Sequence, residues 1–197
     1  MDYPFQIYVA DTETTGLDYL KHDIVELSLY HLNQDRQKTW LLKSPRPESA
    51  QPDALRINGH KLEDISHKTA EGRASYQEPK DVLVSIENWM LEDGASPEEK
   101  VLCGQNIGFD EDFIRVLWES NGAKETFPFG NRPFVLDTRQ IEIFINLIQG
   151  KRNEYYNLGS LVEKYGVKKL KSHRADADTI MTKDVLLKQI EVFTGKK

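Results

Sequence analysis

Three short runs rich in apolar residues open the chain and predict β-strands. Phe5–Asp11, Ile24–Leu32 and Lys38–Lys43 are short for helices and rich in residue types that favour strands. Because short connections join them, we expect the three strands to form an antiparallel meander. The polar segment Asp11–Gly16 is expected to end the first strand.

Helical spacing of apolar residues prevails farther along the chain. Pro45–Ser75, rich in Pro, Gly, His and charge, is expected to be mostly loop with a short helix at Pro52–Ile57. Beyond it, apolar residues recur every three or four positions, which is typical of a helix that buries one face. Such helices are predicted over Pro79–Leu91, Phe109–Asn121, Asp137–Ile148, Asn157–Tyr165 and Arg174–Phe193. The apolar runs Val101–Gln105 and Phe134–Leu136 predict two more strands.

Length and composition indicate one α/β domain over residues 1–197. Hydrophobic residues make up 39% of the chain, which is enough for a core, and helices would cover a central sheet. The sequence contains no run of about 20 apolar residues, and Met1–Pro4 lack the features that open a signal peptide. Cys103, the single cysteine, cannot form an intrachain disulfide. We therefore expect a cytoplasmic protein that does not enter a membrane.

Asp11 and Glu13, at the end of the first predicted strand, are the first candidates for chemistry. Side chains two apart in an extended segment point to the same face, so these carboxylates would meet at the rim of the sheet. Close carboxylates repel one another, and a divalent cation such as Mg²⁺ or Mn²⁺ relieves that repulsion. A solvated turn capped by an aspartate is the alternative. An EF-hand is excluded because its twelfth position is His22 rather than glutamate.

Two further motifs place acids beside predicted helix starts. Asp110 lies between a strand and a helix, where helix capping would also explain an acid. His173 precedes the last helix and Asp178 lies in its opening turns, so that both can face one cleft. An imidazole, whose ordinary pKa is about 6.5, suits the removal of a proton from water. A surface histidine beside a helix-start acid is the alternative explanation.

In their order and spacing, the three motifs resemble those of the DEDDh (DnaQ-like) 3′–5′ exonucleases, a family with the ribonuclease H-like fold. Asp11–Gly16 (DTETTG) resembles the first family motif, Asn106–Asp110 (NIGFD) the second and His173–Asp178 (HRADAD) the third. The resemblance covers nearly the whole chain. It implies an α/β fold in which a mixed sheet, an antiparallel meander plus parallel strands, is covered by helices.

The resemblance also implies a role for each motif residue. Two divalent cations, Mg²⁺ or Mn²⁺, would be held by four acids: Asp11, Glu13, Asp110 and Asp178. His173 would be the general base that deprotonates the attacking water, and 5′-nucleoside monophosphates would leave one at a time from a 3′ end. Physical reasoning agrees, since two cations about 3.5–4 Å apart stabilise both the attacking and the leaving oxygens of a phosphoryl displacement.

Residues beside the motifs are candidates for contact with the terminal nucleotide. They are Thr14, Thr15, Gly16, Leu17, Asn58, Phe109 and His173. Main-chain N–H groups of the first three could bond the 3′-hydroxyl. Leu17 and Phe109 would wedge or stack against the last bases, with ordinary packing as the alternative. Asn58 lies in a loop that loosely resembles a substrate-side loop of relatives.

The net charge limits the ways in which the chain could bind nucleic acid. The chain has 26 Lys and Arg against 32 Asp and Glu, a net charge of −6, which argues against general coating of nucleic acid. We expect an enzyme that grips a few nucleotides at a DNA or RNA 3′ end, single-stranded DNA being preferred, and releases a nucleoside monophosphate. An RNA-trimming or oligoribonuclease-type enzyme and a polymerase-associated proofreading module remain open alternatives. A polymerase or a second copy of the chain is a candidate protein partner.

Overall fold

The computed structural model describes residues 3–130, 133–171 and 173–195 of the chain. Its centre is a five-stranded sheet in the order β3-β2-β1-β4-β5. The strands are β1 (Gln6–Thr14), β2 (Ile24–His31), β3 (Arg36–Leu41), β4 (Lys100–Gly104) and β5 (Phe134–Asp137). Strands β1, β2 and β3 pair antiparallel, whereas β4 is parallel to both β1 and β5. The predicted mixed sheet, a meander plus parallel strands, is confirmed.

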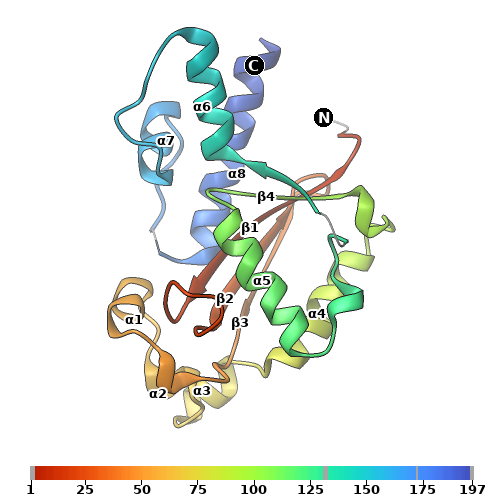
Figure 1. The fold of residues 1–197 in the computed structure, drawn as a ribbon, viewed down its shortest axis with the longest axis vertical. Helices are drawn as coiled ribbons and strands as arrows, with labels where there is room; N and C mark the ends of the chain where they lie inside the picture. Colours follow the sequence, from red (N-terminus) through yellow and green to blue (C-terminus); the bar gives the residue numbers. More distant parts are fainter. Residues whose placement is uncertain (1–2, 131–132, 172, 196–197) are drawn as a thin grey trace.

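Helices cover both faces of the sheet. They are α1 (Pro52–Asn58), α2 (Leu62–Ile65), α3 (Ala70–Ser75), α4 (Pro79–Leu91), α5 (Gly108–Ser120), α6 (Thr138–Gln149), α7 (Leu158–Tyr165) and α8 (Ala175–Thr194). Figure 1 shows α6 and the end of α8 projecting beyond one end of the sheet, with α1, α2 and α3 near the opposite end. None of the helices in the described ranges is long and apolar enough to span a membrane.

Alternation along β1 produces the two buried layers. Tyr8 and Ala10 belong to the core that β1 shares with α4 and α5, whereas Ile7 and Val9 belong to the core against α8. The central strand is buried on both faces because helices lie over each of them. Side chains along β1 therefore point alternately toward α5 and toward α8. Residues from both helices can consequently lie beside the end of the strand.

Two segments differ from the sequence expectations. Strand β1 does not end at Asp11 but continues to Thr14, because β2 pairs with it along that stretch. The segment expected to be mostly loop contains α2 and α3 in addition to the expected α1. Helices this short need tertiary contacts, and a Cβ at Gly72 of α3 would lie 2.3 Å from the carbonyl oxygen of Asp64 in α2. That close contact is not visible in a hydrophobic pattern.

Candidate active site

The candidate site lies where β1 extends beyond its neighbour β4. Pairing between the two strands ends with Val9 opposite Cys103, and β4 itself ends at Gly104. A Cβ at Gly104 would lie 3.0 Å from the carbonyl oxygen of Ala10, so glycine allows the chain to turn away close to β1. From Asp11 onward, none of the strands in the described ranges lies beside β1 on the β4 side.

Asp110 fills the position beside that open edge. Its Oδ1 accepts hydrogen bonds from the main-chain N–H of Thr12 at 2.9 Å and from the Thr12 hydroxyl at 2.7 Å. The N-cap position of α5 is Ile107, and the buried carboxylate of Asp110 reaches across to a residue 98 positions earlier. The structure thus places Asp110 beside Thr12, between the two acids of β1, which helix capping alone would not require.

Asp178, on α8, and His173, just before that helix, approach the same strand end. Oδ2 of the buried Asp178 accepts a hydrogen bond from the main-chain N–H of His173 at 2.9 Å, while its Oδ1 is buried and has no hydrogen-bond partner among the described residues. His173 has a φ of 63°, an uncommon left-handed conformation for a residue with a side chain. One potential ligand atom each from Glu13, His173 and Asp178 lie within 4.8 Å of one another.

All four acids have a raised pKa. Burial, followed by the charges of Asp110 and Asp178, raises the pKa of Asp11 well above its usual range. Burial and the charge of Asp178 raise the pKa of Glu13 to about 8. Burial raises the pKa of Asp110 to about 7 despite the hydrogen bonds that oppose the shift, and it also raises the pKa of Asp178. At neutral pH the cluster would retain protons unless a cation replaced them.

This donor set fits a divalent cation. Carboxylate oxygens are the ligands that Mg²⁺ and Mn²⁺ prefer, and an imidazole nitrogen lies beside them. A buried carboxylate oxygen without a hydrogen-bond partner, such as Oδ1 of Asp178, is rare in folded proteins and suits direct ligation. The positive charge of a bound ion would also lower the raised pKa values of the surrounding acids.

Sequence reasoning missed the role of Glu26, a buried residue on β2 that lies opposite Glu13. Its Oε2 lies 3.1 Å from Nε2 of His60 and 3.4 Å from Nε of Arg174. Burial acts to raise the pKa of Glu26, but the hydrogen bond from His60 and the charge of Arg174 outweigh it and lower that pKa. Glu26 therefore links the segment after α1 to the loop that carries His173.

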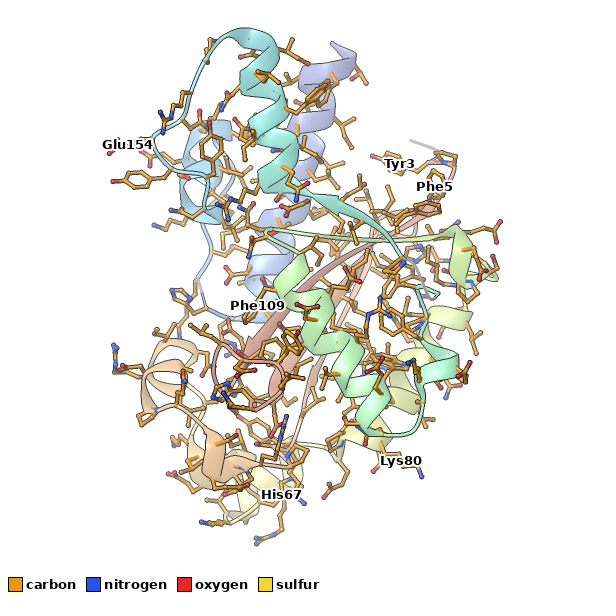
Figure 2. The ribbon with its side chains drawn as sticks, viewed as in Figure 1. Tyr3, Phe5, His67, Lys80, Phe109 and Glu154 are labelled. Carbon is orange, nitrogen blue, oxygen red and sulfur yellow. The ribbon has the colours of Figure 1, made fainter. Side chains whose placement is uncertain are left out.

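Two of the predicted substrate-contact residues are accessible on the rim. Leu17, just after β1, is 77% exposed. Phe109 is half-buried at the start of α5, where Figure 2 labels it, and its ring centroid lies 4.9 Å from that of Phe113. Phe109 directly precedes Asp110 in the sequence, and Leu17 follows the segment Asp11–Gly16. Contact of these side chains with bases stays a prediction.

Other predicted contact residues are used within the fold. The side-chain amide of Asn58 donates to the carbonyl oxygen of Thr14 at 3.0 Å, and the N–H of Thr15 donates to a main-chain carbonyl. All three are buried. A Cβ at Gly16 would lie 2.6 Å from the ring of His22, so glycine here makes room for that ring. These residues shape the end of β1, and their contacts with substrate stay predictions.

The sequence of the whole domain matches a known family. The model of the RNase T family, described as exonuclease, matches residues 8–186. The chain belongs to this exonuclease family. The DnaQ-like family and the ribonuclease H-like fold predicted from the three motifs are confirmed. The enzyme class is accordingly that of a hydrolase acting as a nuclease.

Curated relatives and solved structures agree with this family. A DNA polymerase III of PolC type from Staphylococcus aureus (strain bovine RF122 / ET3-1) is 26% identical over 184 residues, 93% of this chain and 11% of that protein. The zinc-bound complex of E. coli ExoI with single-stranded DNA has a TM-score of 0.75 and 16% identity, covering 98% of this chain and 42% of that chain. Exonuclease I from Methylocaldum szegediense has a TM-score of 0.74 and 16% identity, with 98% and 41% covered. The chain thus spans about a tenth of the polymerase and less than half of each exonuclease I chain.

Proposed function

We propose that the protein is a metal-dependent 3′–5′ exonuclease that removes 5′-nucleoside monophosphates from the 3′ ends of single-stranded nucleic acid, preferably DNA. The observation that carries this proposal is that an acid from α5, an acid from α8 and the histidine just before α8 converge on the end of β1. Membership of an exonuclease family and similarity in fold to an enzyme solved with single-stranded DNA support it. The buried free thiol of Cys103 fits a cytoplasmic location.

The acids Asp11, Glu13, Asp110 and Asp178 would hold the cations, two Mg²⁺ or Mn²⁺ by resemblance to the family. When bound, such cations stabilise the charge that develops on the phosphate oxygens and make a bound water easier to deprotonate. The chain's own contribution is to fix the ligands before substrate arrives. Thr12 orients Asp110 through two donors, and the main-chain N–H of His173 occupies one oxygen of Asp178, which leaves the other available.

His173 is the proposed general base, which takes a proton from water on an imidazole nitrogen. Its side chain is exposed to solvent, yet its nitrogen lies within 4.8 Å of carboxylate oxygens of Glu13 and Asp178. The hydrogen bond from its own N–H to Asp178 supports the left-handed conformation of His173 beside the cluster. A base held this way accepts the proton without a prior rearrangement of the loop.

Oligonucleotides labelled at one end test this function. A strand labelled on its last nucleotide should release a labelled monophosphate at once in Mg²⁺, whereas a 5′-labelled strand should shorten stepwise. Asp178→Asn should abolish both results, and Asp176→Asn, two residues away on the same helix and 48% exposed in its side chain, should not. Release of 5′-terminal nucleotides first, or equal rates in EDTA, would contradict the proposal. An RNA strand run in parallel determines the sugar preference.

A proofreading role beside a polymerase is the second candidate, and the similarity to PolC-type polymerases favours it. In that role the enzyme would act on primer ends that are locally unpaired. Primer–template duplexes that end in a mismatch should then lose the terminal nucleotide faster than matched duplexes do. Equal rates on the two duplexes would argue against proofreading and leave the exonuclease proposal unaffected.

A further inference from the structure

A trough leads away from the candidate active site along α7. Three cavities of about 300, 450 and 520 Å³ follow one another there. The first is lined by His173 and Asp178 and shares Leu158 with the second, and the second shares Tyr155 with the third. Because they share lining residues, the cavities form one path from the catalytic cluster to the loop between α6 and α7, which Figure 2 marks at Glu154.

The far part of this trough is basic, although the chain as a whole carries a net charge of −6. Arg139 lines the second cavity, and Lys151 and Arg152 line the third. Over the described part of the chain, neither Lys151 nor Arg152 forms an ion pair, and both are exposed. Glu154 is an opposing acid at the same loop. The balance of free charge in this part of the trough therefore favours an anionic ligand.

The loop presents Tyr155 from a fixed backbone. Its neighbour Tyr156 is anchored, since its carbonyl oxygen accepts a hydrogen bond from the Gln105 side chain at 2.7 Å. The Tyr156 hydroxyl accepts bonds from the side chain of Asn146 and the N–H of Asn153, both at 3.2 Å. Tyr155 is 59% exposed and borders two of the three cavities. An exposed aromatic ring on an anchored loop suits stacking against a planar ligand.

We propose that this trough binds the nucleotides on the 5′ side of the scissile bond as an extended single strand. A base would stack on Tyr155, and the phosphates would follow Arg139, Lys151 and Arg152. Any base can stack on an aromatic ring, and every nucleotide carries the same backbone charge, so this binding has little sequence preference. The inference rests on the proposed function, because the catalytic cluster fixes the 3′ end from which the strand enters the trough.

Hydrolysis of thymidine oligonucleotides of increasing length tests the trough. For the wild-type chain, kcat/KM should rise between a dinucleotide and a strand of about ten nucleotides. Tyr155→Ala should lower kcat/KM about tenfold on the long strand, through KM, and leave the dinucleotide unchanged. Tyr155→Phe, which keeps the ring, should behave as wild type. An equal effect of Tyr155→Ala on both substrates, or no effect on either, would overturn the proposal.

The salt dependence of binding provides a readout independent of turnover. Anisotropy of the labelled long strand is measured on the Asp178→Asn background so that the strand stays intact. Replacing Lys151 and Arg152 together by alanine should reduce the slope of log K against log salt by about 1.4, the value for two phosphate contacts on a single strand. The matched control replaces Lys80 and Lys124, two exposed lysines on α4 and near α5, and should leave the slope unchanged. Figure 2 shows Lys80 far from Glu154.

The two proposals fail in different ways. A chain that hydrolyses short and long strands equally in every variant would retain the exonuclease and refute the trough. Suppose instead that the chain hydrolyses nothing, but that Tyr155→Ala weakens strand binding and the Lys151 and Arg152 variant reduces its salt dependence. This result would support strand binding in the trough and refute the exonuclease proposal. Equal slopes for the trough pair and the control pair would also refute the trough.

Discussion

Replacing Glu13 by glutamine should stabilise the metal-free protein at neutral and mildly basic pH. The two side chains have nearly the same shape, so the substitution removes a charge with little change in packing. Burial and the charges of Asp178 and Glu26 raise the pKa of Glu13 from 4.5 to about 8. Removing a carboxylate whose ionised form the fold disfavours therefore relieves repulsion in the folded state.

The magnitude follows from proton linkage. Because the pKa of Glu13 is higher in the folded chain than in the unfolded chain, the folded chain binds more protons between about pH 4.5 and pH 8. The free energy of unfolding therefore falls as pH rises through that window and is restored as pH falls. From a shift of 4.5 to about 8, this group alone accounts for a loss of about 2 kcal/mol between about pH 6 and pH 8. Glu13→Gln removes that loss.

Urea unfolding in EDTA, followed by tryptophan fluorescence, measures this effect at the two pH values. The wild-type free energy of unfolding should fall more steeply than that of Glu13→Gln, by about 2 kcal/mol. Glu125→Gln, at an exposed position outside the site, is the control and should follow the wild type. Saturating Mg²⁺ should flatten the wild-type dependence. Parallel losses in wild type and Glu13→Gln would refute the claim that this carboxylate is crowded.

Three further substitutions test separate parts of the site. Thr12→Val removes one of the two donors to Asp110 and should weaken Mn²⁺ binding, measured by calorimetry, about tenfold. If the variant bound Mn²⁺ with wild-type affinity, the Thr12 hydroxyl would not orient Asp110. His173→Ala should lower turnover at neutral pH by at least about a hundredfold, with partial recovery at higher pH as hydroxide replaces the base. An unchanged neutral rate in the pH profile would eliminate that role. His60→Ala removes a hydrogen-bond donor from the buried carboxylate of Glu26 and should lower the free energy of unfolding in urea by about 1–3 kcal/mol. An unchanged free energy of unfolding would disprove the link between His60 and Glu26.

Local sequence patterns predict most of the helices and strands of the fold. The helical face of Pro79–Leu91 predicts the observed bounds of α4, because the proline at its first turn and its apolar spacing both lie within the segment. The helix predicted to begin at Asp137 is observed as α6, and the Asp137 side chain caps α6 by accepting a hydrogen bond from the N–H of Arg139 at 2.9 Å. The three motifs likewise identify the family from short stretches of sequence, because each acid lies near the end of a strand or the start of a helix.

The parts that sequence reasoning missed depend on contacts between distant segments. Strand β1 extends past Asp11 because it pairs there with β2, and Asp110, far along the chain, satisfies the N–H of Thr12 on the open edge. Glu26 resembles an ordinary polar residue in a strand, and only the register of β1 against β2 places it opposite Glu13. Likewise, only the arrangement of α7 beside the cluster places the cavity near Tyr155 in line with the site.

Titration of the metal-free protein with Mn²⁺, with free ion followed by electron paramagnetic resonance and protons by an indicator dye, tests the central claim most directly. If the acids of β1, α5 and α8 share one crowded site, then Mn²⁺ should bind near neutral pH and displace protons as it does so. Asp11→Asn should greatly weaken the binding and the proton release together. Binding by wild type no stronger than by Asp11→Asn, or binding without proton release, would contradict the account.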